Sequence, residues 1–317
     1  MLKTEWTEKI KKLKQEKNAV LLAHYYQRPE VQDIADFLGD SLQLSQVAAQ
    51  TNADIIVFAG VHFMAETAKI LSPEKKVLIP DPDAGCSLAE SCKASDFKKF
   101  IDEHPGHTVI SYVNTTAEVK ALTDICCTSS NALKIVQSLP KSEKIIFGPD
   151  KNLGNYIKSV TGRENMLVWN GVCHVHEAFS VEKVVALKKK HPDAKVLAHP
   201  ECKEQVLLLA DYIGSTAALL AFSAQDGSKR YIVATESGII HQMQKRSPGK
   251  EFIPVPSSNA LDGDADDSCG ACNDCEYMKV INLEKIYLSL LHEQYEITLP
   301  EEVRKKAERA ILNMLHL

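Results

Sequence analysis

One pattern of short apolar runs occurs three times in the chain, at intervals of 86 to 88 residues, and it constrains the fold more than any other feature. The first run of each copy ends in polar residues, at 19–26, 108–114 and 195–201. Hydroxyl-rich stretches follow, and we expect them to start helices: Asp40-Ser41, Thr128-Ser129 and Ser215-Thr216. A second apolar run then comes at 55–59, 144–147 and 231–234. Each copy therefore predicts a strand, a helix, a strand, a helix and a third strand.

Cysteines follow the third apolar run of every copy. Cys86 follows residues 77–79, Cys173 follows 166–169, and a group of three, Cys269, Cys272 and Cys275, follows 251–255. Short apolar strands that alternate with helices predict parallel sheets covered on both faces. Such sheets bind ligands beyond the carboxyl ends of their strands. The sequence thus predicts an α/β protein of three pseudo-symmetric, three-layer αβα domains with short parallel sheets around a central active site.

Composition limits the classes of function. The 317 residues are enough for three units of under a hundred residues each. A net charge of −5 argues against a nucleic-acid surface, and no apolar run is long enough for a membrane span. The expected first helix, at roughly 5–16, is charged and amphipathic, unlike a secretory signal. Nine cysteines without such a signal indicate a reducing compartment, so we expect a cytoplasmic protein.

Polar residues two apart at the first strand ends share a face, because side chains alternate along a strand. These pairs are His24 with Tyr26, Tyr112 with Asn114, and His199 with Glu201. His199 and Glu201 are a candidate acid/base pair, although a surface ion pair and, for His24, a buried core histidine are plain alternatives. Ser41, Ser129, Ser215 and Thr216 are helix caps or anion-binding helix starts. Residues 235–240, which follow a strand, are a further candidate for the cavity wall.

Other segments carry simpler expectations. Cys126 and Cys127 are expected to open a helix as small buried residues. The acidic, glycine-rich insert at 256–274 is expected to form a mobile loop. Beyond it, residues 277–293 and 298–315 predict two amphipathic helices that cover the structure, the second with Pro300 at an early position.

The terminal cysteines resemble a bacterial ferredoxin run, but Lys279 stands where its fourth cysteine would be. The paired CxxC motifs of a structural zinc site are also missing. The repeat supplies one cysteine per unit instead: Cys86, Cys173 and one of the final three. Three thiolates around a [4Fe-4S] cluster would leave one iron open as a Lewis acid. A cluster-dependent hydro-lyase, an iron-sulfur redox sensor and a zinc protein remain alternatives.

The motifs across almost the whole chain resemble those of the quinolinate synthase family. They are His24-Tyr-Tyr26, Pro29-Glu-Val-Gln-Asp-Ile-Ala-Asp36, Gly39-Asp-Ser41, Phe63-Met-Ala-Glu-Thr-Ala68, Tyr112-Val-Asn114, Cys127-Thr-Ser-Ser-Asn-Ala132, Asn170-Gly-Val-Cys-His-Val-His176, His199-Pro-Glu201 and Cys275-x-x-Met278. The resemblance implies three pseudo-symmetric domains around an oxygen-sensitive [4Fe-4S] cluster. It also implies condensation of iminoaspartate with dihydroxyacetone phosphate to quinolinate, the precursor of the NAD pyridine ring.

The resemblance also assigns residues, position by position. The cluster ligands become Cys86, Cys173 and Cys275, the last because the family's ligand precedes x-x-Met. Candidates for proton transfer are Tyr26, Tyr112, Glu201 and His199. Residues that would hold carboxylates and phosphate are His24, Ser41, Asn114, Ser129, His176, Ser215 and Thr216. The implied functional partner is an aspartate-oxidising enzyme, L-aspartate oxidase or dehydrogenase.

Two further expectations concern the domains and the insert. We expect the domains to span 1–104, 105–190 and 191–282, with C-terminal helices in 283–317 packing on them. Cys269 and Cys272 form a CxxC pair, a redox-prone spacing. Our hypothesis is that they form a reversible disulfide that moves the loop carrying Cys275, and unpaired cysteines in a loop are the alternative.

Overall fold

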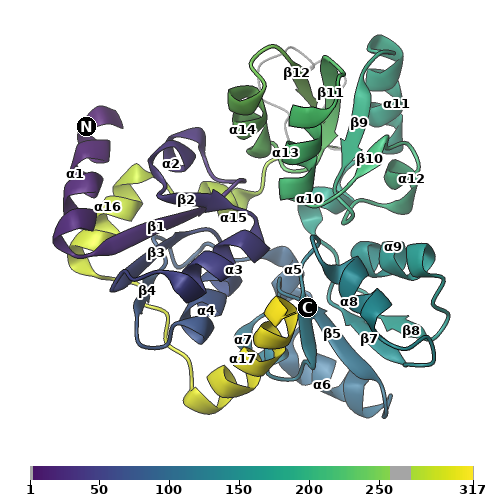
Figure 1. The fold of residues 1–317 in the computed structure, drawn as a ribbon, viewed down its shortest axis with the longest axis horizontal. Helices are drawn as coiled ribbons and strands as arrows, with labels where there is room; N and C mark the ends of the chain where they lie inside the picture. The colour runs from purple at the N-terminus through teal and green to yellow at the C-terminus, as the bar shows by residue number, and fades with distance from the viewer. Residues whose placement is uncertain (1–2, 258–272, 317) are drawn as a thin grey trace.

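Three parallel sheets, each covered by helices, make up the protein in a computed structural model that describes residues 3–257 and 273–316. The sheets have the strand orders β2-β1-β3-β4, β6-β5-β7-β8 and β10-β9-β11-β12, so one topology occurs three times. Figure 1 shows the three units arranged around a common centre. The predicted α/β class with three short parallel sheets is confirmed.

The first unit carries an extra helix at its start. Its elements are α1 (Lys3–Glu16), β1 (Ala19–His24), α2 (Pro29–Ile34), β2 (Phe37–Gly39), α3 (Ser41–Gln50), β3 (Ile55–Ala59), α4 (His62–Leu71), β4 (Lys76–Leu78), α5 (Ser87–Glu90) and α6 (Ala94–Asp102). The apolar residues of β1 and β3 are buried because helices cover both faces of this sheet.

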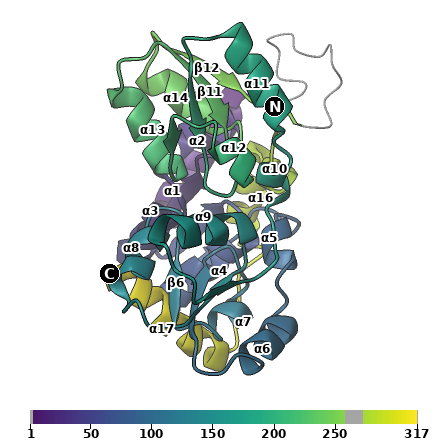
Figure 2. The same ribbon diagram turned by 90° about the vertical axis from the view of Figure 1, so that its right-hand side faces the viewer.

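The second unit repeats the same order. Its elements are β5 (Thr108–Tyr112), α7 (Ala117–Lys120), β6 (Ile125–Cys127), α8 (Ala132–Ser138), β7 (Ile145–Gly148), α9 (Lys151–Thr161), β8 (Met166–Val168), α10 (His174–Glu177) and α11 (Val181–Lys190). In Figure 2, α6 and α7 lie at one end of the molecule and helices of the third unit lie at the other.

The third unit and the C-terminal helices complete the chain. They comprise β9 (Lys195–Ala198), α12 (Glu204–Leu207), β10 (Tyr212–Ile213), α13 (Thr216–Gln225), β11 (Arg230–Ala234), α14 (Ile239–Arg246), β12 (Glu251–Pro254), α15 (Glu276–Lys279), α16 (Leu283–His292) and α17 (Glu301–His316). The expected single helix at 277–293 is wrong, because α15 ends at Lys279 and Asn282 caps a new helix by accepting a hydrogen bond from the backbone N of Lys285 at 2.9 Å.

Each unit contains one strand more than the repeat predicted. The additional strands, β2, β6 and β10, are two or three residues long and pair only with the first strand of their unit. Cys126 and Cys127 therefore lie in strand β6 and do not open a helix. Strands this short show no periodicity, which explains why the sequence pattern did not reveal them. The short edge strand and the second long strand flank the first strand on opposite sides, so the strand order reverses there. Parallel sheets bind ligands at the carboxyl ends of the strands beside such a point.

Of the three predicted helix starts, the first and the third are confirmed and the second is shifted. Ser41 is the first residue of α3, and Asp40 is its N-cap, with a capping box that Gln43 completes. Ser129 lies in the turn before α8, which begins at Ala132. Ser215 caps α13 as expected, since its Oγ accepts a hydrogen bond from the backbone N of Ala218 at 3.3 Å.

The C-terminal helices join the units. Tyr287 on α16 packs against Trp6 on α1, with ring centroids 5.1 Å apart. Helix α17 contacts both the first and the second unit: Arg304 donates to the carbonyl of Ile70, and Asn313 donates to the carbonyl of Asp124 at 2.9 Å. Figure 1 shows α17, in yellow, beside α4 and α7. The largest apolar core includes residues of all three units and of these helices.

Part of the predicted insert, including Cys269 and Cys272, lies outside the described residues, and so does the disulfide hypothesis. Within residues 3–257 and 273–316, none of the helices combines the length and the apolar character that crossing a bilayer requires.

Candidate active site

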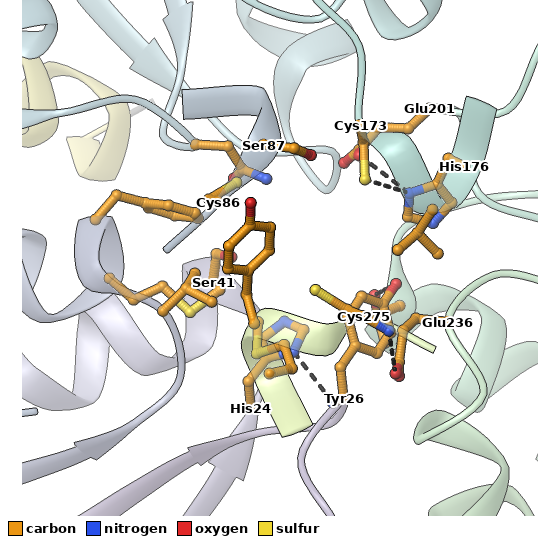
Figure 3. A pocket seen from close by; sticks show the side chains of 18 of the residues that line it. His24, Tyr26, Ser41, Cys86, Ser87, Cys173, His176, Glu201, Glu236 and Cys275 are labelled. Carbon is orange, nitrogen blue, oxygen red and sulfur yellow. Dashed lines mark hydrogen bonds and ion pairs between the residues drawn. The ribbon is translucent and has the colours of Figure 1, made fainter. Parts of the chain in front are cut away.

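A cavity lies where the three units meet, and the strand-end residues of all three line it (Figure 3). The first unit contributes His24, Tyr26, Ser41 and Cys86, the second contributes Tyr112, Asn114, Ser129, Cys173 and His176, and the third contributes His199, Glu201, Thr216 and Glu236. Cys275, Tyr277 and Met278 complete the lining from the segment around α15. Every predicted site residue therefore lines the cavity except Ser215, whose hydroxyl is buried in its own helix cap.

A continuous hydrogen-bonded chain of five side chains crosses this site. The Tyr26 hydroxyl lies 2.6 Å from Oγ1 of Thr235, which lies 3.0 Å from Nε2 of His176. On the other side of that imidazole, Nδ1 lies 3.2 Å from Oε2 of Glu201. The Tyr112 hydroxyl donates to Oε1 of Glu201 at 2.6 Å. The chain of contacts therefore links the first unit, through the third, to the second.

Glu201 is a buried carboxylate at the centre of this arrangement, with 3% of its surface exposed. Burial raises its pKa, but His176 and His199, with the hydrogen bonds from His176 and Tyr112, outweigh burial and lower the pKa to about 2. Its backbone is fixed by Asn152, whose side-chain amide donates to the Glu201 carbonyl at 3.0 Å. At neutral pH Glu201 is thus ionised and accepts hydrogen bonds from both sides.

Two histidines of the cavity are neutral. Burial lowers the pKa of both His24 and His199 to about 3. Nδ1 of His24 accepts a hydrogen bond from the backbone N of Tyr26 at 3.2 Å, so its Nε2 carries the proton. Nε2 of His199 lies 3.2 Å from Oγ of Ser129, and its ring stacks on His176 with centroids 4.7 Å apart. Neutral imidazoles can both donate and accept protons.

The two tyrosines are protonated phenols. Burial is the main cause that raises the pKa of Tyr26 and of Tyr112 well above 10.0. Tyr26 lies between two threonine hydroxyls, at 2.8 Å from Oγ1 of Thr216 and 2.6 Å from Oγ1 of Thr235. Both phenols are therefore hydrogen-bond donors at neutral pH.

Asn114 has a buried acceptor without a donor. Within the described part of the chain, its Oδ1 and Oε1 of Gln27 are the buried side-chain oxygens that accept no hydrogen bond. Buried polar atoms are nearly always paired in folded proteins. Because Asn114 also lines the cavity, its Oδ1 is available to an N–H or O–H group of a bound molecule.

The three cysteines share one local structure. Cys86, Cys173 and Cys275 are each the N-cap residue of a four-residue helix, α5, α10 and α15, and each is a free thiol. Burial raises the pKa of Cys86 to about 11 and that of Cys275 to about 12, and it raises the pKa of Cys173 as well. Thiolates at these positions therefore require a cation to stabilise them.

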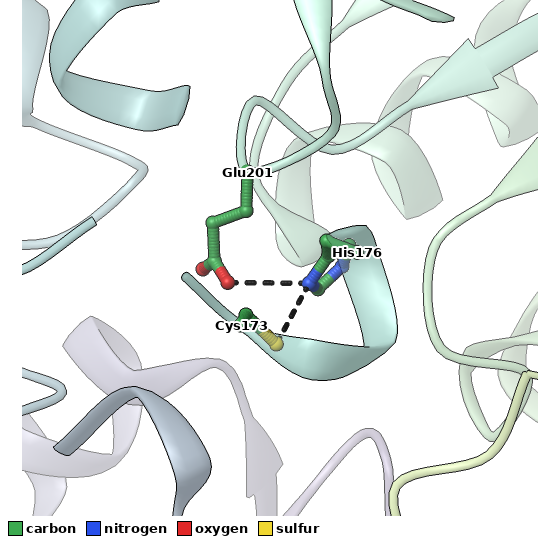
Figure 4. A group of neighbouring side chains, drawn as sticks. All are labelled: Cys173, His176 and Glu201. Carbon is green, nitrogen blue, oxygen red and sulfur yellow. Dashed lines mark hydrogen bonds and ion pairs between the residues drawn. The ribbon is translucent and has the colours of Figure 1, made fainter. Parts of the chain in front are cut away.

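The cysteines do not converge on a single point. Among the described residues, the one group of three ligand atoms within 4.8 Å of one another is Cys173, His176 and Glu201 (Figure 4). Figure 3 shows Cys86, Cys173 and Cys275 on different sides of the cavity. A polynuclear cluster binds its thiolates through separate metal atoms, so this spread fits a cluster better than one ion shared by all three thiols.

Sequence reasoning gave no role to the buried Asp150 beside the site, and it covered the buried Glu236 only as part of residues 235–240, a candidate for the cavity wall. Asp150 accepts hydrogen bonds from the backbone N of Leu153 at 2.7 Å and of Cys173 at 3.3 Å. Glu236 accepts from the backbone N of Cys275 at 3.1 Å and pairs with Lys279 at 2.7 Å. Burial raises the pKa of Glu236, whereas Lys279 opposes that rise. Their common position, two residues after the second long strand of their units, was a signal that could have identified them.

Strand-end tyrosines, histidines and a glutamate, set around three thiols in one cavity, define an enzyme with its active site between three αβα units. The family model for the quinolinate synthetase A protein matches residues 8–316, and the chain belongs to that family. The resemblance noted in the motifs is thereby confirmed.

Curated relatives are similar to the chain over more than nine tenths of their length. The chain is 57% identical to the quinolinate synthase of Microcystis aeruginosa over 308 residues, which cover 97% of this chain and 93% of the relative. It is 56% identical to the quinolinate synthase of Chloroherpeton thalassium over 310 residues, covering 98% and 94% of the two chains.

Proposed function

We propose that the chain condenses iminoaspartate with dihydroxyacetone phosphate, with loss of phosphate and water, to form quinolinate for NAD biosynthesis. The observation that carries this proposal is that one thiol from each repeat opens into the same cavity as the chain from Tyr26 to Tyr112. Cys86, Cys173 and Cys275 would hold a [4Fe-4S] cluster there. When bound, such a cluster supplies a Lewis-acidic iron that can polarise a hydroxyl or carboxylate group.

The side chains of the cavity suit the proton transfers of this reaction. A proton must leave a ketose carbon, and protons must reach the oxygens that depart as water. The ionised Glu201 accepts a proton, while Tyr112, 2.6 Å away, and Tyr26 donate one. His199, whose pKa is about 3, is a neutral imidazole that serves in either direction. His176 and Thr235 connect the two tyrosines, so a proton taken up on one side can be returned on the other.

The substrates carry carboxylates and a phosphate, yet neither lysine nor arginine is among the described residues that line the cavity. Neutral donors must therefore hold these anions. His24, Ser129 and the amide of Asn114 are within the lining, and Ser41 and Thr216 begin the ten-residue helices α3 and α13. Helix starts present unpaired backbone N–H groups and a positive dipole end to an anion.

Iminoaspartate is unstable, so an aspartate-oxidising enzyme, L-aspartate oxidase or dehydrogenase, is the functional partner in this proposal. The cytoplasm is the compartment that suits it, since thiols and an open cluster persist under reducing conditions.

The test begins with metal content. Iron and acid-labile sulfide per chain, measured with the visible spectrum after anaerobic purification, should each be near four for a [4Fe-4S] cluster. Quinolinate formation should then require both iminoaspartate and dihydroxyacetone phosphate. Turnover of a hydroxy acid without the triose phosphate would indicate a hydro-lyase instead. A well-folded protein that contains iron but makes no quinolinate would favour a redox sensor.

One observation favours a second candidate, a mononuclear zinc site. Cys173, His176 and Glu201 place a sulfur, a nitrogen and an oxygen within 4.8 Å of one another, a ligand set that zinc accepts. This alternative gives no role to Cys86 or Cys275. A colourless protein with zinc as its metal would establish it and overturn the cluster proposal.

A further inference from the structure

Asp150 and Glu236 occupy the same place in two repeats. Each stands two residues after the second long strand of its unit, β7 or β11, and each is 0% exposed. Each accepts a hydrogen bond from the backbone N of its own unit's cysteine: Cys173 at 3.3 Å and Cys275 at 3.1 Å. Two of the three cysteine loops are therefore attached to their sheets by a buried carboxyl group.

In the first unit, a backbone hydrogen bond attaches the cysteine loop to the sheet. Val61 stands two residues after β3, so no carboxyl group is present there. Instead, the backbone N of the next residue, His62, donates to the carbonyl of Ala84 at 2.7 Å, two residues before Cys86. The segment that follows the second long strand thus attaches the cysteine loop in all three units, through a carboxyl group in two of them and through the backbone in the first.

Glu236 is the more heavily engaged of the two carboxylates. Its Oε1 lies 2.7 Å from Nζ of Lys279 and accepts from the backbone N of Cys275, while its Oε2 accepts from the backbone N of Gly238 at 2.8 Å. Both oxygens are therefore occupied by protein groups. Although Glu236 lines the cavity, it is in a position to orient other residues rather than to exchange protons with a substrate.

Lys279 extends this contact to the first unit. Its Nζ also donates to the carbonyl of Tyr26 at 2.6 Å, and Arg28 donates to the carbonyl of Lys279 at 2.8 Å. Helix α15, which carries Lys279, follows β12 only after a connection of 21 residues, from 255 to 275. The contacts of Lys279 with Glu236, Tyr26 and Arg28 attach this helix to the third and first units. The ion pair of Glu236 with Lys279 therefore joins the third unit, the Cys275 loop and the turn that carries Tyr26.

We propose that Glu236 and Lys279 are positioning residues: they hold Cys275 in place for metal binding, and they fix the position of Tyr26 relative to Cys275. Asp150 holds Cys173 in place in the same way. The inference rests on the proposed function, in which these cysteines are cluster ligands. This positioning requires the negative charge of the Glu236 carboxylate as well as its shape. An amide at position 236 would leave the Lys279 ammonium without its partner and would turn an N–H donor toward other donors.

The experiment compares Glu236→Gln, Lys279→Met, Lys279→Arg and Asp150→Asn with the wild type. Glu251→Gln is the matched control, since Glu251 is exposed on β12 and pairs with Arg230 at 2.6 Å, away from the cavity lining. The first readout is the rate at which anaerobically loaded protein releases iron to a chelator. The second is the rate at which iodoacetamide alkylates each cysteine of the iron-free protein, determined by peptide mass mapping. Far-UV circular dichroism checks that each variant is folded.

We expect Glu236→Gln and Lys279→Met to release iron about tenfold faster or more, as is typical when residues that orient metal ligands are changed. Alkylation should be faster at Cys275 in these two variants and faster at Cys173 in Asp150→Asn. The alkylation rate of Cys86 should stay at the wild-type value in all three variants. Lys279→Arg, which keeps the charge, and Glu251→Gln should behave like the wild type.

Wild-type release and alkylation rates in folded Glu236→Gln and Lys279→Met would overturn the inference. If Glu236→Gln does not fold, the contrast between Lys279→Met and Lys279→Arg decides, because the two differ in the charge on a side chain that is 17% exposed. A wild-type protein that takes up no iron would instead overturn the proposed function, so the two failures are distinguishable.

Discussion

The phenol of Tyr112 donates a 2.6 Å hydrogen bond to the carboxylate of Glu201 and thereby joins the second unit to the third. Tyr112 ends β5, and Glu201 lies three residues beyond the end of β9, so the partners come from corresponding ends of two repeats. Hydrogen bonds to an ionised carboxylate are stronger than those between neutral groups. Glu201 therefore remains ionised although it is buried, and Tyr112 remains a donor directed at it.

Replacement of Tyr112 by phenylalanine should remove this donor without emptying its site. We expect quinolinate formation to fall by about 10²- to 10⁴-fold, the usual contribution of one positioned acid or base, while iron content stays at the wild-type value. Tyr25→Phe is the matched control, because Tyr25 is equally buried but does not line the cavity. Activity of Tyr112→Phe within twofold of the wild type would exclude Tyr112 from proton transfer.

Each cysteine of the cavity should be needed for the metal. We expect Cys86→Ser, Cys173→Ser and Cys275→Ser to lose most of their iron and sulfide and the associated visible absorbance after anaerobic reconstitution, because each unit supplies one ligand. Cys92→Ala is the control, since Cys92 is fully buried outside the cavity. It should keep its iron even if its thermal stability falls. Full iron content in a serine variant would remove that cysteine from the ligand set.

Two buried groups of opposite charge, Glu66 in the first unit and Lys120 in the second, should make a large contribution to stability. Lys120 is 0% exposed and donates to the carbonyl of Thr115, and Glu66 accepts from the backbone N of Ala117 at 3.0 Å. Burial lowers the pKa of Lys120, and Glu66 is the largest opposing influence. Lys120→Met should remove the charge that most opposes the burial-driven rise in the pKa of Glu66, and we expect a cost of about 3 kcal/mol.

Thermal unfolding of Lys120→Met and of Lys120→Met/Glu66→Gln tests this. The double variant should regain part of the lost stability, because it carries no unpaired buried charge. If the single variant melts with the wild type, the pair does not stabilise the contact between the units.

Stability at acidic pH should depend on Glu293. Its carboxylate pairs with Lys17 and Lys76, and these hydrogen bonds lower its pKa from 4.5 to about 2. The folded state therefore binds this proton less tightly than the unfolded chain does. The contribution is fully present above pH 4.5 and is lost as pH falls toward 2. For two partly exposed pairs we expect about 1 kcal/mol at neutral pH.

Melting temperatures measured from pH 7 to pH 2 provide the check. Glu293→Gln should melt lower than the wild type at pH 7, and the difference should shrink below pH 4.5. Glu284→Gln, an exposed change on α16, the helix that Glu293 follows, should match the wild-type curve at every pH. A difference that persists unchanged at pH 2 would show that the carboxylate charge is not responsible.

Much of the fold was predictable because its signals are local. Apolar runs ending in polar residues identified the first strands and placed His24, Tyr112 and Glu201 near one cavity, and loops with Gly and Pro brought Cys86 and Cys173 to its edge. The edge strands β2, β6 and β10 were not predictable, since two or three residues paired on one side leave no periodic pattern. For the same reason Cys126 and Cys127 were expected in a helix and lie in β6.

The sequence by itself determined the three-fold repeat, the class of the fold and the residue types at each strand end, because burial and turn formation depend on neighbouring residues. Only the tertiary structure decided which of those groups touch. Thr235 connects Tyr26 to His176, and Glu236 pairs with Lys279 across the end of the insert, through contacts between segments far apart in the chain. Such contacts depend on how the units pack against one another, and no local pattern in the chain records that packing.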